Sequence, residues 1–408
     1  MTRQRIAIVG GGGAGLCTAW LLQHSHEVTL FEKEGHLGGH ARTVDVAADG
    51  GMVNAETGFK YFLDGSHETL LALMRLLGLR PERRTSSLTV DDRRHGRVLV
   101  LPPRSPLQAA RLLRHLPLVR ALRRMMAGAD GVVARRDWSK TLADEARDLG
   151  LSDRFVSELL LPLVASSWGT TVEQMAAFPA YDVMKNLWKG AAGFYELPGG
   201  VSAYVRALAA ATTARVETGH PVARIASDGD GVLVDGARFD QVVVATPPWV
   251  AAELLGSLPV AAALREFRWF DTRIFIHGDP SFMPRARGDW SVINHRFEPD
   301  HLQMTEWSGH QRRLPVFRTW LPSGLPEPAP THARKDFQHL LVTPANETLQ
   351  RRLEEQQGAS RVWLAGMYVT DVDDHESALV SAIRVATALC PGSPTLAQLN
   401  AAVAGAAG

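Results

Sequence analysis

The sequence predicts an α/β fold, and three short apolar runs support this prediction. The run at 5–9 leads into a glycine turn and a helical pattern, while the runs at 241–245 and 362–366 end before prolines and at a glycine. Buried strands that alternate with helical patterns are typical of a parallel sheet covered by helices. With 408 residues, 45% of them hydrophobic, the chain is long enough for roughly two or three domains.

Charge and cysteine content exclude several classes of protein. The 44 Lys and Arg residues balance 43 Asp and Glu residues to a net charge of +1, so there is no overall basic field for nucleic acid. The two cysteines, Cys17 and Cys390, have no CxxC spacing, and no HExxH motif is present. We expect no metal site. Because neither a signal-peptide pattern nor a membrane-length apolar run occurs, we also expect a cytoplasmic protein.

A glycine turn follows the first predicted strand directly. Residues 10–15, GGGGAG, satisfy GxGxxG, and a helical pattern follows at 16–23. In this arrangement Gly10 permits the tight turn, Gly12 allows a phosphate to approach, and Gly15 allows the helix to pack closely. The N–H groups at the helix start then face a pyrophosphate. The predicted contacts from this turn are Gly10, Gly12, Gly13, Ala14 and Gly15.

An acidic residue ends the second predicted strand. The run at 27–31 reaches Glu32 about twenty residues after the turn, where a carboxylate binds an adenosine ribose hydroxyl in Rossmann-like domains. An acid at this position argues against a 2′-phosphate. Strand, turn, helix and acid together predict a Rossmann-like dinucleotide site. The alternative is a structural turn in an unliganded domain.

A second glycine pair, Gly38 and Gly39, follows the acid within the run LGGHART at 37–43. NAD-only dehydrogenases do not need such a segment, so FAD outranks NAD as the expected cofactor. The alternative is an ordinary surface turn. The run resembles the second phosphate-contacting segment of the flavoprotein superfamily of amine oxidases and carotenoid desaturases. This resemblance implies FAD contacts from Lys33, Gly38, Gly39, His40, Ala41 and Arg42.

Later segments occur in the order found in that superfamily. Strand-like runs at 214–216, 222–225, 232–234 and 241–245 predict a β-meander that returns to a buried strand. The run at 362–366 precedes a helical pattern whose start, by resemblance, directs N–H groups at the pyrimidine edge of the flavin. A helix N-terminus stabilises an anion by roughly 0.3–1 kcal/mol. The further FAD contacts that the resemblance implies are Thr57, Gly58, Val222, Ala245, Gly366, His375, Ser377 and Ala378.

Over nearly its whole length the chain resembles one bacterial branch of the superfamily, the NAD/FAD-binding amine-oxidase-like flavoproteins often found beside cyclopropane-fatty-acid synthases. The matching runs are GGGGAGL at 10–16, LGGHART at 37–43, ETGF at 56–59, residues 161–175, PGG at 198–200 and HESAL at 375–379. The resemblance implies a Rossmann-like FAD-binding domain of the GR2 type with an interleaved α+β substrate domain. The expected FAD-binding domain comprises 1–60, 205–260 and 355–408, and the substrate domain comprises a first insertion, 61–204, and a second insertion, 261–354.

Three departures from the branch pattern lie near the expected flavin. Glu56 stands where Asp is common, Lys60 replaces an aliphatic residue, and Tyr368 occurs in an unusual segment after Gly366. These changes do not affect the expectation of FAD binding, but they leave the identity of the substrate undetermined. Lys60, Tyr368 and Trp168, the last within a run that matches the branch, are the candidate substrate contacts.

The resemblance implies an FAD-dependent oxidoreductase, an oxidase, dehydrogenase or desaturase. It would remove a hydride, through flavin N5, from a largely apolar small molecule, either lipid-like or a secondary-metabolite intermediate. His375 and Glu376 would tune the flavin or relay protons, and the alternative for both is helix capping. The rival functions are a redox-neutral FAD-dependent isomerase or mutase, an amine oxidase proper, and a non-catalytic binding subunit.

The segment 104–136 is rich in arginine and leucine, and Asp130 is its only acidic residue. Helical patterns at 68–77, 106–126, with an interruption at Pro117, and 139–149 predict a mostly helical first insertion, and a strand is expected at 273–277 in the second. A basic amphipathic helix can lie on an anionic membrane surface, so one interpretation is peripheral membrane contact through 104–136. The alternative is a solvated arginine face above a packed apolar stripe. No feature specifies an oligomeric state.

Overall fold

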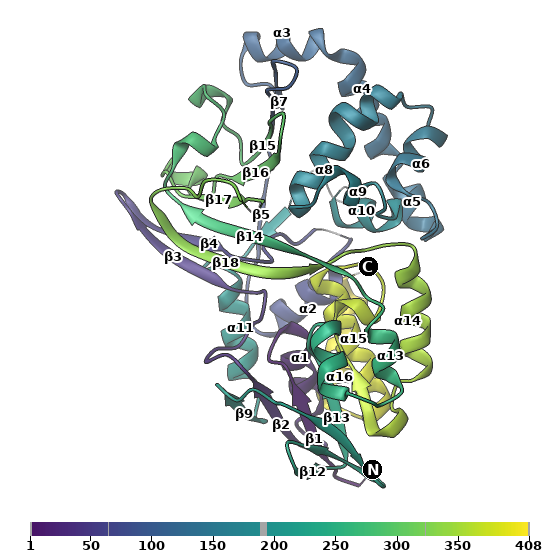
Figure 1. Cartoon of the computed structure of the whole chain (residues 1–408). Helices are drawn as coiled ribbons and strands as arrows, with labels where there is room; N and C mark the ends of the chain where they lie inside the picture. Colours follow the sequence, from purple (N-terminus) through teal and green to yellow (C-terminus); the bar gives the residue numbers. More distant parts are fainter. Residues whose placement is uncertain (1, 64, 188–193, 323, 407–408) are drawn as a thin grey trace.

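Five parallel strands form the sheet that carries the glycine turn, in a computed structural model that describes residues 2–63, 65–187, 194–322 and 324–406 (Figure 1). Their order is β19-β13-β1-β2-β9, so segments from the start, middle and end of the chain lie side by side. This arrangement confirms the predicted α/β class. The strands are β1 (Arg5–Val9), β2 (Glu27–Glu32), β9 (Arg215–Thr218), β13 (Gln241–Val244) and β19 (Val362–Leu364).

Alternate side chains of these strands enter two different cores, because successive residues of a strand face opposite sides of the sheet. Ile6 and Ile8 face one core, and Ala7 and Val9 face the other. The first core contains α1 (Gly13–Leu22), α2 (Glu68–Leu76), α11 (Val201–Ala210), α15 (His375–Leu389) and α16 (Pro394–Ala406). The second contains β10 (Ile225–Asp228), β11 (Gly231–Val234), β12 (Ala237–Phe239), α12 (Pro248–Leu255), α13 (Val260–Leu264) and α14 (Ala345–Glu355).

A seven-stranded sheet joins the two insertions. Strands β6 and β7 come from the first insertion, the other five come from the second, and the parallel pairing of β6 with β15 connects them. The predicted strand at 273–277 lies within β14. In order across the sheet, the strands are β18 (Thr331–Leu340), β14 (Trp269–His277), β17 (Phe317–Trp320), β16 (Leu302–Glu306), β15 (Ile293–Phe297), β6 (Leu88–Asp92) and β7 (Arg97–Leu101).

The helices of the first insertion lie beside this sheet (Figure 1). The expected helix at 106–126 is divided at His115, because Pro117 has no N–H to donate and is tolerated only in the first turn of a helix. The helices are α3 (Pro106–Arg114), α4 (Leu116–Ala127), α5 (Ala129–Arg135), α6 (Leu142–Asp148), α7 (Asp153–Phe155), the π-helical turn η1 (Val156–Leu160), α8 (Leu161–Trp168), α9 (Val172–Met175) and α10 (Ala180–Leu187).

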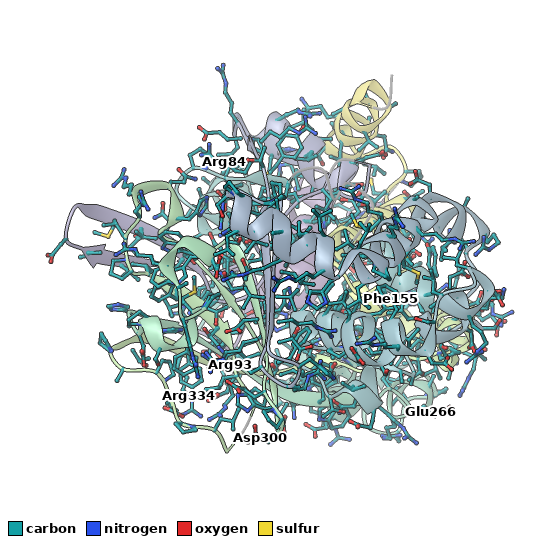
Figure 2. All side chains as sticks on the ribbon, turned by 90° about the horizontal axis from the view of Figure 1, so that it is seen from above. Arg84, Arg93, Phe155, Glu266, Asp300 and Arg334 are labelled. Atoms are coloured by element: carbon teal, nitrogen blue, oxygen red, sulfur yellow. The ribbon has the colours of Figure 1, made fainter. Side chains whose placement is uncertain are left out.

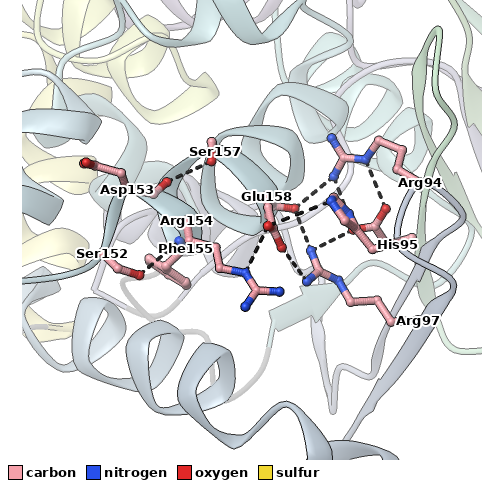
Figure 3. Close-up of polar contacts among 10 residues, drawn as sticks. Arg94, His95, Arg97, Ser152, Asp153, Arg154, Phe155, Ser157 and Glu158 are labelled. Carbon is pink, nitrogen blue, oxygen red and sulfur yellow. Dashed lines mark hydrogen bonds and ion pairs between the residues drawn. The ribbon is translucent and has the colours of Figure 1, made fainter.

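A cluster of ion pairs fixes α7 and η1 to the β6–β7 hairpin (Figure 3). Glu158 of η1 lies 2.8 Å from Arg97 and 3.0 Å from Arg154. The buried Asp92 lies 3.0 Å from Arg94 and 2.7 Å from Arg97. The arginines of this hairpin are therefore neutralised within the protein.

The predicted meander differs from the structure in two places. The run at 214–216 does form a strand, β9, but this strand pairs with β2 in the parallel sheet and does not belong to the meander. Within the run at 222–225, the N–H groups of Ala223 and Arg224 donate to the Asp235 carboxylate, at 3.0 Å and 2.8 Å, so β10 begins only at Ile225. The remaining elements are the hairpin β3 (Thr43–Ala48) and β4 (Gly51–Glu56), the pair β5 (Glu82–Arg84) and β8 (Phe194–Glu196), and the short turns η2 (Pro280–Phe282), η3 (Arg287–Asp289), η4 (His310–Arg312), η5 (Ala359–Arg361) and η6 (Met367–Val369).

Candidate functional site

The turn after β1 leaves open space in front of the N-terminus of α1. A Cβ atom on Gly10, which has a φ of +108°, would lie 2.6 Å from the Ala245 carbonyl oxygen. A Cβ atom on Gly15 would lie 1.9 Å from the Gly10 carbonyl oxygen, so packing requires glycine at both positions. At Gly12 no described atom lies within 4 Å of the same point, and no described side chain caps the helix there. An open, uncapped helix N-terminus of this kind fits a pyrophosphate.

The second glycine pair packs directly on the first turn. The Gly38 N–H donates to the Gly11 carbonyl oxygen at 2.9 Å, and the Ala41 N–H donates to the Gly38 carbonyl oxygen at 2.9 Å. A Cβ atom on Gly39 would lie 3.2 Å from the Gly12 Cα atom. The two segments predicted to contact phosphate therefore form one surface.

The segment at 57–59 lies against the residues that follow the second pair. The Phe59 N–H donates to the His40 carbonyl oxygen at 3.1 Å, and the Thr57 N–H donates to the Arg42 carbonyl oxygen at 2.9 Å. Gly58 is required here, because a Cβ atom on it would lie 2.1 Å from the His40 carbonyl oxygen. The Arg42 side chain is exposed. It is free to meet a phosphate.

Glu32 ends β2 beside the glycine turn, as the ribose prediction requires. Its carboxylate is buried and accepts hydrogen bonds from the Gly11 N–H at 2.6 Å and from the Glu34 N–H at 2.9 Å. These bonds fix the carboxylate at the turn. Lys33 points into solvent, with its Nζ 3.8 Å from Glu34 Oε1.

Val222, Ala245 and Gly366 lie on three other segments. The His220 N–H donates to the Glu32 carbonyl oxygen at 2.9 Å, so the chain that leads to Val222 begins beside the predicted ribose acid. Ala245 continues β13 and contacts the glycine turn through its carbonyl oxygen. Gly366 follows β19 with a φ of +153°, a backbone conformation that favours glycine.

Helix α15 begins at the same end of the five-stranded sheet. The Asp374 carboxylate caps it by accepting a hydrogen bond from the Ser377 N–H at 2.6 Å. Ser377 and Ala378 are buried in its first turn. Because a side chain already caps this helix, the predicted use of its N–H groups by the flavin stays a prediction.

His375 packs against the glycine turn. A Cβ atom on Gly13 would lie 2.5 Å from its Cε1 atom, and its ring stacks on Phe59 at 4.6 Å and meets the edge of Tyr204 at 5.7 Å. Burial lowers the pKa of His375 to about 3, so the ring is neutral at pH 7. Its Nε2 atom is buried and has no hydrogen-bond partner among the described residues. An unpaired polar atom beside the open turn fits a bound cofactor.

Glu376 has a different environment. Its two carboxylate oxygens accept hydrogen bonds from the N–H groups of Thr69, at 2.7 Å, and Leu70, at 3.0 Å, at the start of α2. Burial raises its pKa to about 7 despite these bonds. Its contacts are those of a helix cap, the alternative to catalysis that the sequence leaves open.

Three buried carboxyl groups cluster at the junction of α10 and α15. The Asp373 N–H donates to Asp182 Oδ1 at 3.1 Å. Burial, together with Asp374, raises the pKa of Asp373 to about 8, and burial raises that of Asp374 to about 6. Burial and Asp373 raise the pKa of Asp182 well above its ordinary value. The folded protein therefore holds protons here that the unfolded chain has lost.

Stability is expected to fall as pH rises from about 4 to about 8, because in that window the folded state binds more protons than the unfolded state. Asp373→Asn should make the free energy of unfolding depend less on pH, stabilising the protein at pH 8 and having little effect at pH 5. Asp373 can change the free energy of unfolding by at most about 1.4 kcal/mol for each pH unit of the window. Urea unfolding across this range measures the slope. The exposed Asp271→Asn is the control, and an unchanged slope in Asp373→Asn would contradict the assignment.

Lys60, predicted to contact substrate, lies in a buried ion-pair cluster. Its Nζ atom bonds Glu306 and lies 3.0 Å from Glu196, and Glu306 Oε2 lies 3.3 Å from Arg318. Burial alone would lower the pKa of Lys60, but Glu306 and Glu196 outweigh it and the pKa rises. Burial would raise the pKa of Glu306, but Lys60 and Arg318 lower it to about 2. Glu196 also lies 3.5 Å from Arg84, which pairs with Glu82, so the six charges of the cluster sum to zero. Lys60 therefore has no free charge to offer a ligand.

Trp168 ends α8 beside the seven-stranded sheet. A Cβ atom on Gly169, the next residue, would lie 2.5 Å from Trp320 and 2.7 Å from Thr272. The Arg318 guanidinium lies 4.0 Å from the centroid of the Trp320 indole. This end of α8 therefore meets the indole of Trp320 on β17 and the hydroxyl of Thr272 on β14.

Tyr368 lies in the short turn η6 after β19 and belongs to the same hydrophobic core as Trp168. Its ring would lie 2.9 Å from a Cβ atom on Gly366 and meets the edge of Phe267 at 5.6 Å. Its hydroxyl is buried and has no hydrogen-bond partner among the described residues. Within the described part of the chain, the ring of Tyr368 pairs with that of Phe267 and not with that of Trp168.

A cavity of about 340 Å³ opens beside α15, and Tyr181, Lys185, Asp371 and Glu376 are among its lining residues. A second, of about 330 Å³, lies between α12 and β14 and includes Trp249 and Trp269. Neither is lined by the glycine turn, Trp168, Lys60 or Tyr368. Of the residues assigned to the cofactor, Gly39 and His375 instead lie beside the glycine turn, at Gly12 and Gly13.

The sequence pattern did not reveal Glu306, Arg318 and Trp320. They lie on β16 and β17, where Glu306 and Arg318 are paired across the strands. The alternation of apolar and polar residues at 302–306, LQMTE, could have indicated a strand. The partner of each charge depends on strand register, which one sequence does not specify.

Solved structures resemble this fold over almost their whole length. A fatty acid isomerase from P. acnes that produces CLA is 15% identical, with a TM-score of 0.69, and the match covers 95% of this chain and 99% of that one. Putrescine oxidase bound to putrescine is 12% identical, with a TM-score of 0.67 and coverage of 96% and 99%. Cyclohexylamine oxidase from Brevibacterium oxydans is 17% identical, with a TM-score of 0.64 and coverage of 95% and 100%. At these identities the likeness concerns the fold.

The sequence match is more specific. Residues 14–273, more than half of the 408 residues, match the family described as flavin containing amine oxidoreductase. This stretch includes both glycine segments except for the first residues of the GxGxxG turn. The match agrees with the open phosphate surface at Gly12 and with the unpaired Nε2 atom of His375. The chain therefore belongs to the flavin-containing amine oxidoreductases, and it is an FAD-dependent enzyme.

Proposed function

We propose that this enzyme oxidises a largely apolar small molecule, a lipid-like compound or a secondary-metabolite intermediate, as an oxidase, dehydrogenase or desaturase. The observation that carries this proposal is the charge balance near Trp168. Lys60, Arg318, Glu306 and Glu196 are paired with one another, so they leave no free charge to anchor an ionic substrate. The aromatic side chains at the end of α8 favour an apolar ligand.

Residues of four segments would hold FAD. The N-terminus of α1 and Gly38–Ala41 would face the pyrophosphate, Glu32 the ribose, and Arg42 a phosphate oxygen. When bound, FAD supplies the acceptor for two electrons and a proton from the substrate. His375 presents a neutral ring whose Nε2 can accept a hydrogen bond at the cofactor. Glu376, with a pKa of about 7, can hold a proton near neutral pH.

A second candidate function is redox-neutral isomerisation. The isomerase from P. acnes has a TM-score of 0.69 and is covered over 99% of its length, so this fold accommodates such a reaction on an acyl chain. The two functions differ in one property, because only the oxidation leaves the cofactor reduced.

Anaerobic absorption spectroscopy of the purified holoenzyme tests the proposal. A fatty-acyl or other apolar compound is expected to bleach the flavin band near ~450 nm, whereas amines of similar size should leave it unchanged. Bleaching by an amine alone would identify an amine oxidase proper. Product that forms only after chemical reduction of the flavin, without net oxidation, would establish the isomerase. Both results contradict the first proposal.

A further inference from the structure

Helix α3 turns Gln108 and Arg111 toward the protein and leaves two of its three leucines, Leu107 and Leu113, in solvent, while Leu112 packs partly against the core. Within α3, all of which the structure describes, only Gln108 is buried. Its Nε2 atom donates to Asp289 Oδ1 at 2.9 Å and to the Gly288 carbonyl oxygen at 3.0 Å, and Arg111 lies 2.9 Å from Asp289. Surface helices of globular proteins normally show the opposite arrangement, with the apolar face on the core.

The outward face of α3 carries two leucines. Leu107 is 61% exposed and Leu113 is 68% exposed, the highest values among the described large hydrophobic residues. Helical spacing places Ala110 between them and Arg114 beside Leu107. Ser105 caps the helix, since its hydroxyl accepts a hydrogen bond from the Gln108 N–H at 3.3 Å, and proline is its first residue. The face is therefore presented by a preformed helix.

The same helix lies at one end of the molecule, farthest from the five-stranded sheet (Figure 1). Figure 2 looks down on this end and shows α3 lying across it, uncovered by other elements. Helix α4 begins two residues after α3 ends. An approaching flat surface would meet α3 first.

The two helices also carry positive charge that no described carboxylate pairs with. No Asp or Glu occurs between positions 93 and 129. The arginines of the β6–β7 hairpin in this interval meet carboxylates, as Figure 3 shows for Arg94 and Arg97. Exposed arginines of α3 and α4 have no ion-pair partner among the described residues, and these are Arg114, Arg120, Arg123 and Arg124.

We propose that α3 and the adjoining arginines of α4 dock the enzyme on an anionic lipid bilayer. Leu107 and Leu113 enter the boundary between headgroups and acyl chains, and the arginines meet lipid phosphates, as in interfacial amphipathic helices. Among the described residues, no helix is long and apolar enough to cross the bilayer, so the contact is with its surface. The proposal uses surface residues alone and does not depend on the substrate.

Other occupants fit this face less well. A second copy of the chain in a symmetric dimer would bring the same unpaired arginines together, and their repulsion opposes that contact. Nucleic acid would neutralise the arginines and leave Leu107 and Leu113 in water. A bilayer with anionic headgroups satisfies both the charges and the apolar side chains.

Vesicle flotation of the full-length holoenzyme tests the docking. Vesicles of equal parts phosphatidylglycerol and phosphatidylcholine are expected to bind the protein at least ~10-fold more tightly than pure phosphatidylcholine, with binding weakened by salt. Leu107→Ser/Leu113→Ser should lose about 10-fold of this affinity. Arg114→Gln/Arg120→Gln/Arg123→Gln/Arg124→Gln should remove the preference for anionic vesicles and most of the salt dependence.

The matched control changes one exposed apolar residue and one exposed arginine elsewhere, Met52→Ser/Arg224→Gln, and should bind as wild type. All substituted side chains are exposed, so melting temperatures should stay within a few degrees and retained flavin should be unchanged. Failure of the wild type to bind anionic vesicles would overturn the proposal. The proposal would also be wrong if the wild type formed a dimer that the leucine substitutions dissociate, or if it bound nucleic acid in preference to vesicles.

Discussion

Gly12→Val is expected to give a folded protein that retains no FAD. Gly12 has a φ of −71° and no described atom within 4 Å of its would-be Cβ atom, so a valine side chain fits the protein itself. That side chain would fill the space in front of α1 that a pyrophosphate needs. Valine is a poor helix N-cap, so the apoprotein should lose only about 1 kcal/mol. We expect at least a ~100-fold weaker affinity for FAD, because the phosphate can no longer reach the helix N–H groups.

Two readouts separate flavin loss from misfolding. The absorption spectrum and the flavin released on denaturation report retention, while the melting temperature, compared with apoprotein prepared from wild type, reports folding. Gly35→Val is the matched control, because Gly35 also has no described atom within 4 Å of its would-be Cβ atom and lies outside the turn. Gly15→Val should not fold, since its Cβ atom would lie 1.9 Å from a carbonyl oxygen. Flavin retained by Gly12→Val would place the cofactor elsewhere.

The sequence predicts those parts of the site whose residues are neighbours in the chain. The strand, turn and helix at 5–22 follow from residues that are neighbours in the chain, and so does the position of Glu32 at the end of β2. The second glycine pair was recognised by its place after that acid. Its contact with Gly12 then follows from the short connection between them.

Contacts between distant segments could not be predicted in the same way. The bond from Lys60 to Glu306 joins residues 246 positions apart, and it depends on how the second insertion packs against the end of the segment 1–60. The contact of His375 with Gly13 depends on the packing of α15 against α1. The parallel pairing of β6 with β15 has no local signal, because each strand reads as an ordinary alternating run.

The late start of β10 shows that hydrogen bonds to a more distant residue can override the local preference for a strand. Val222, Ala223 and Arg224 read as strand residues, but Asp235 holds the backbone of Ala223 and Arg224 outside the sheet. Asp235 has a φ of +47°, a conformation that the turn after β11 imposes and that aspartate tolerates better than most residues. The strand therefore starts three residues later than the pattern indicates.

Lys60→Met is expected to destabilise the protein by roughly 3–5 kcal/mol, because removing one partner of a buried ion pair leaves an uncompensated charge. Glu306 is fully buried, and after the change Arg318, at 3.3 Å, is its one remaining cationic partner among the described residues, beside the Ser308 hydroxyl at 3.0 Å. Denaturant unfolding of wild type and variant measures the difference. Lys140→Met, which breaks an exposed pair with Asp148, is the matched control and should change stability by less than about 1 kcal/mol.

The dependence of this loss on pH identifies its cause. The pKa of Glu306 is held at about 2, below the ordinary 4.5, so its ionised form stabilises the folded state above pH 4.5, and this stabilisation is lost as pH falls toward 2. The loss in Lys60→Met should therefore be largest above pH 4.5 and shrink in acid, where protonation removes the unpaired charge. A loss that is independent of pH would indicate that packing of the lysine stem, rather than its charge, is what the variant removes.

A second substitution tests the charge balance directly. Lys60→Met/Glu196→Gln removes one charge of each sign and leaves Glu306 paired with Arg318, so it should recover more than half of the lost stability. No recovery would mean that Glu196 does not share in the balance. If Lys60→Met alone were as stable as wild type, the lysine would not be paired in the folded protein. Its Nζ atom would then be free for a ligand, and the flavin-bleaching assay would show whether that ligand carries a negative charge.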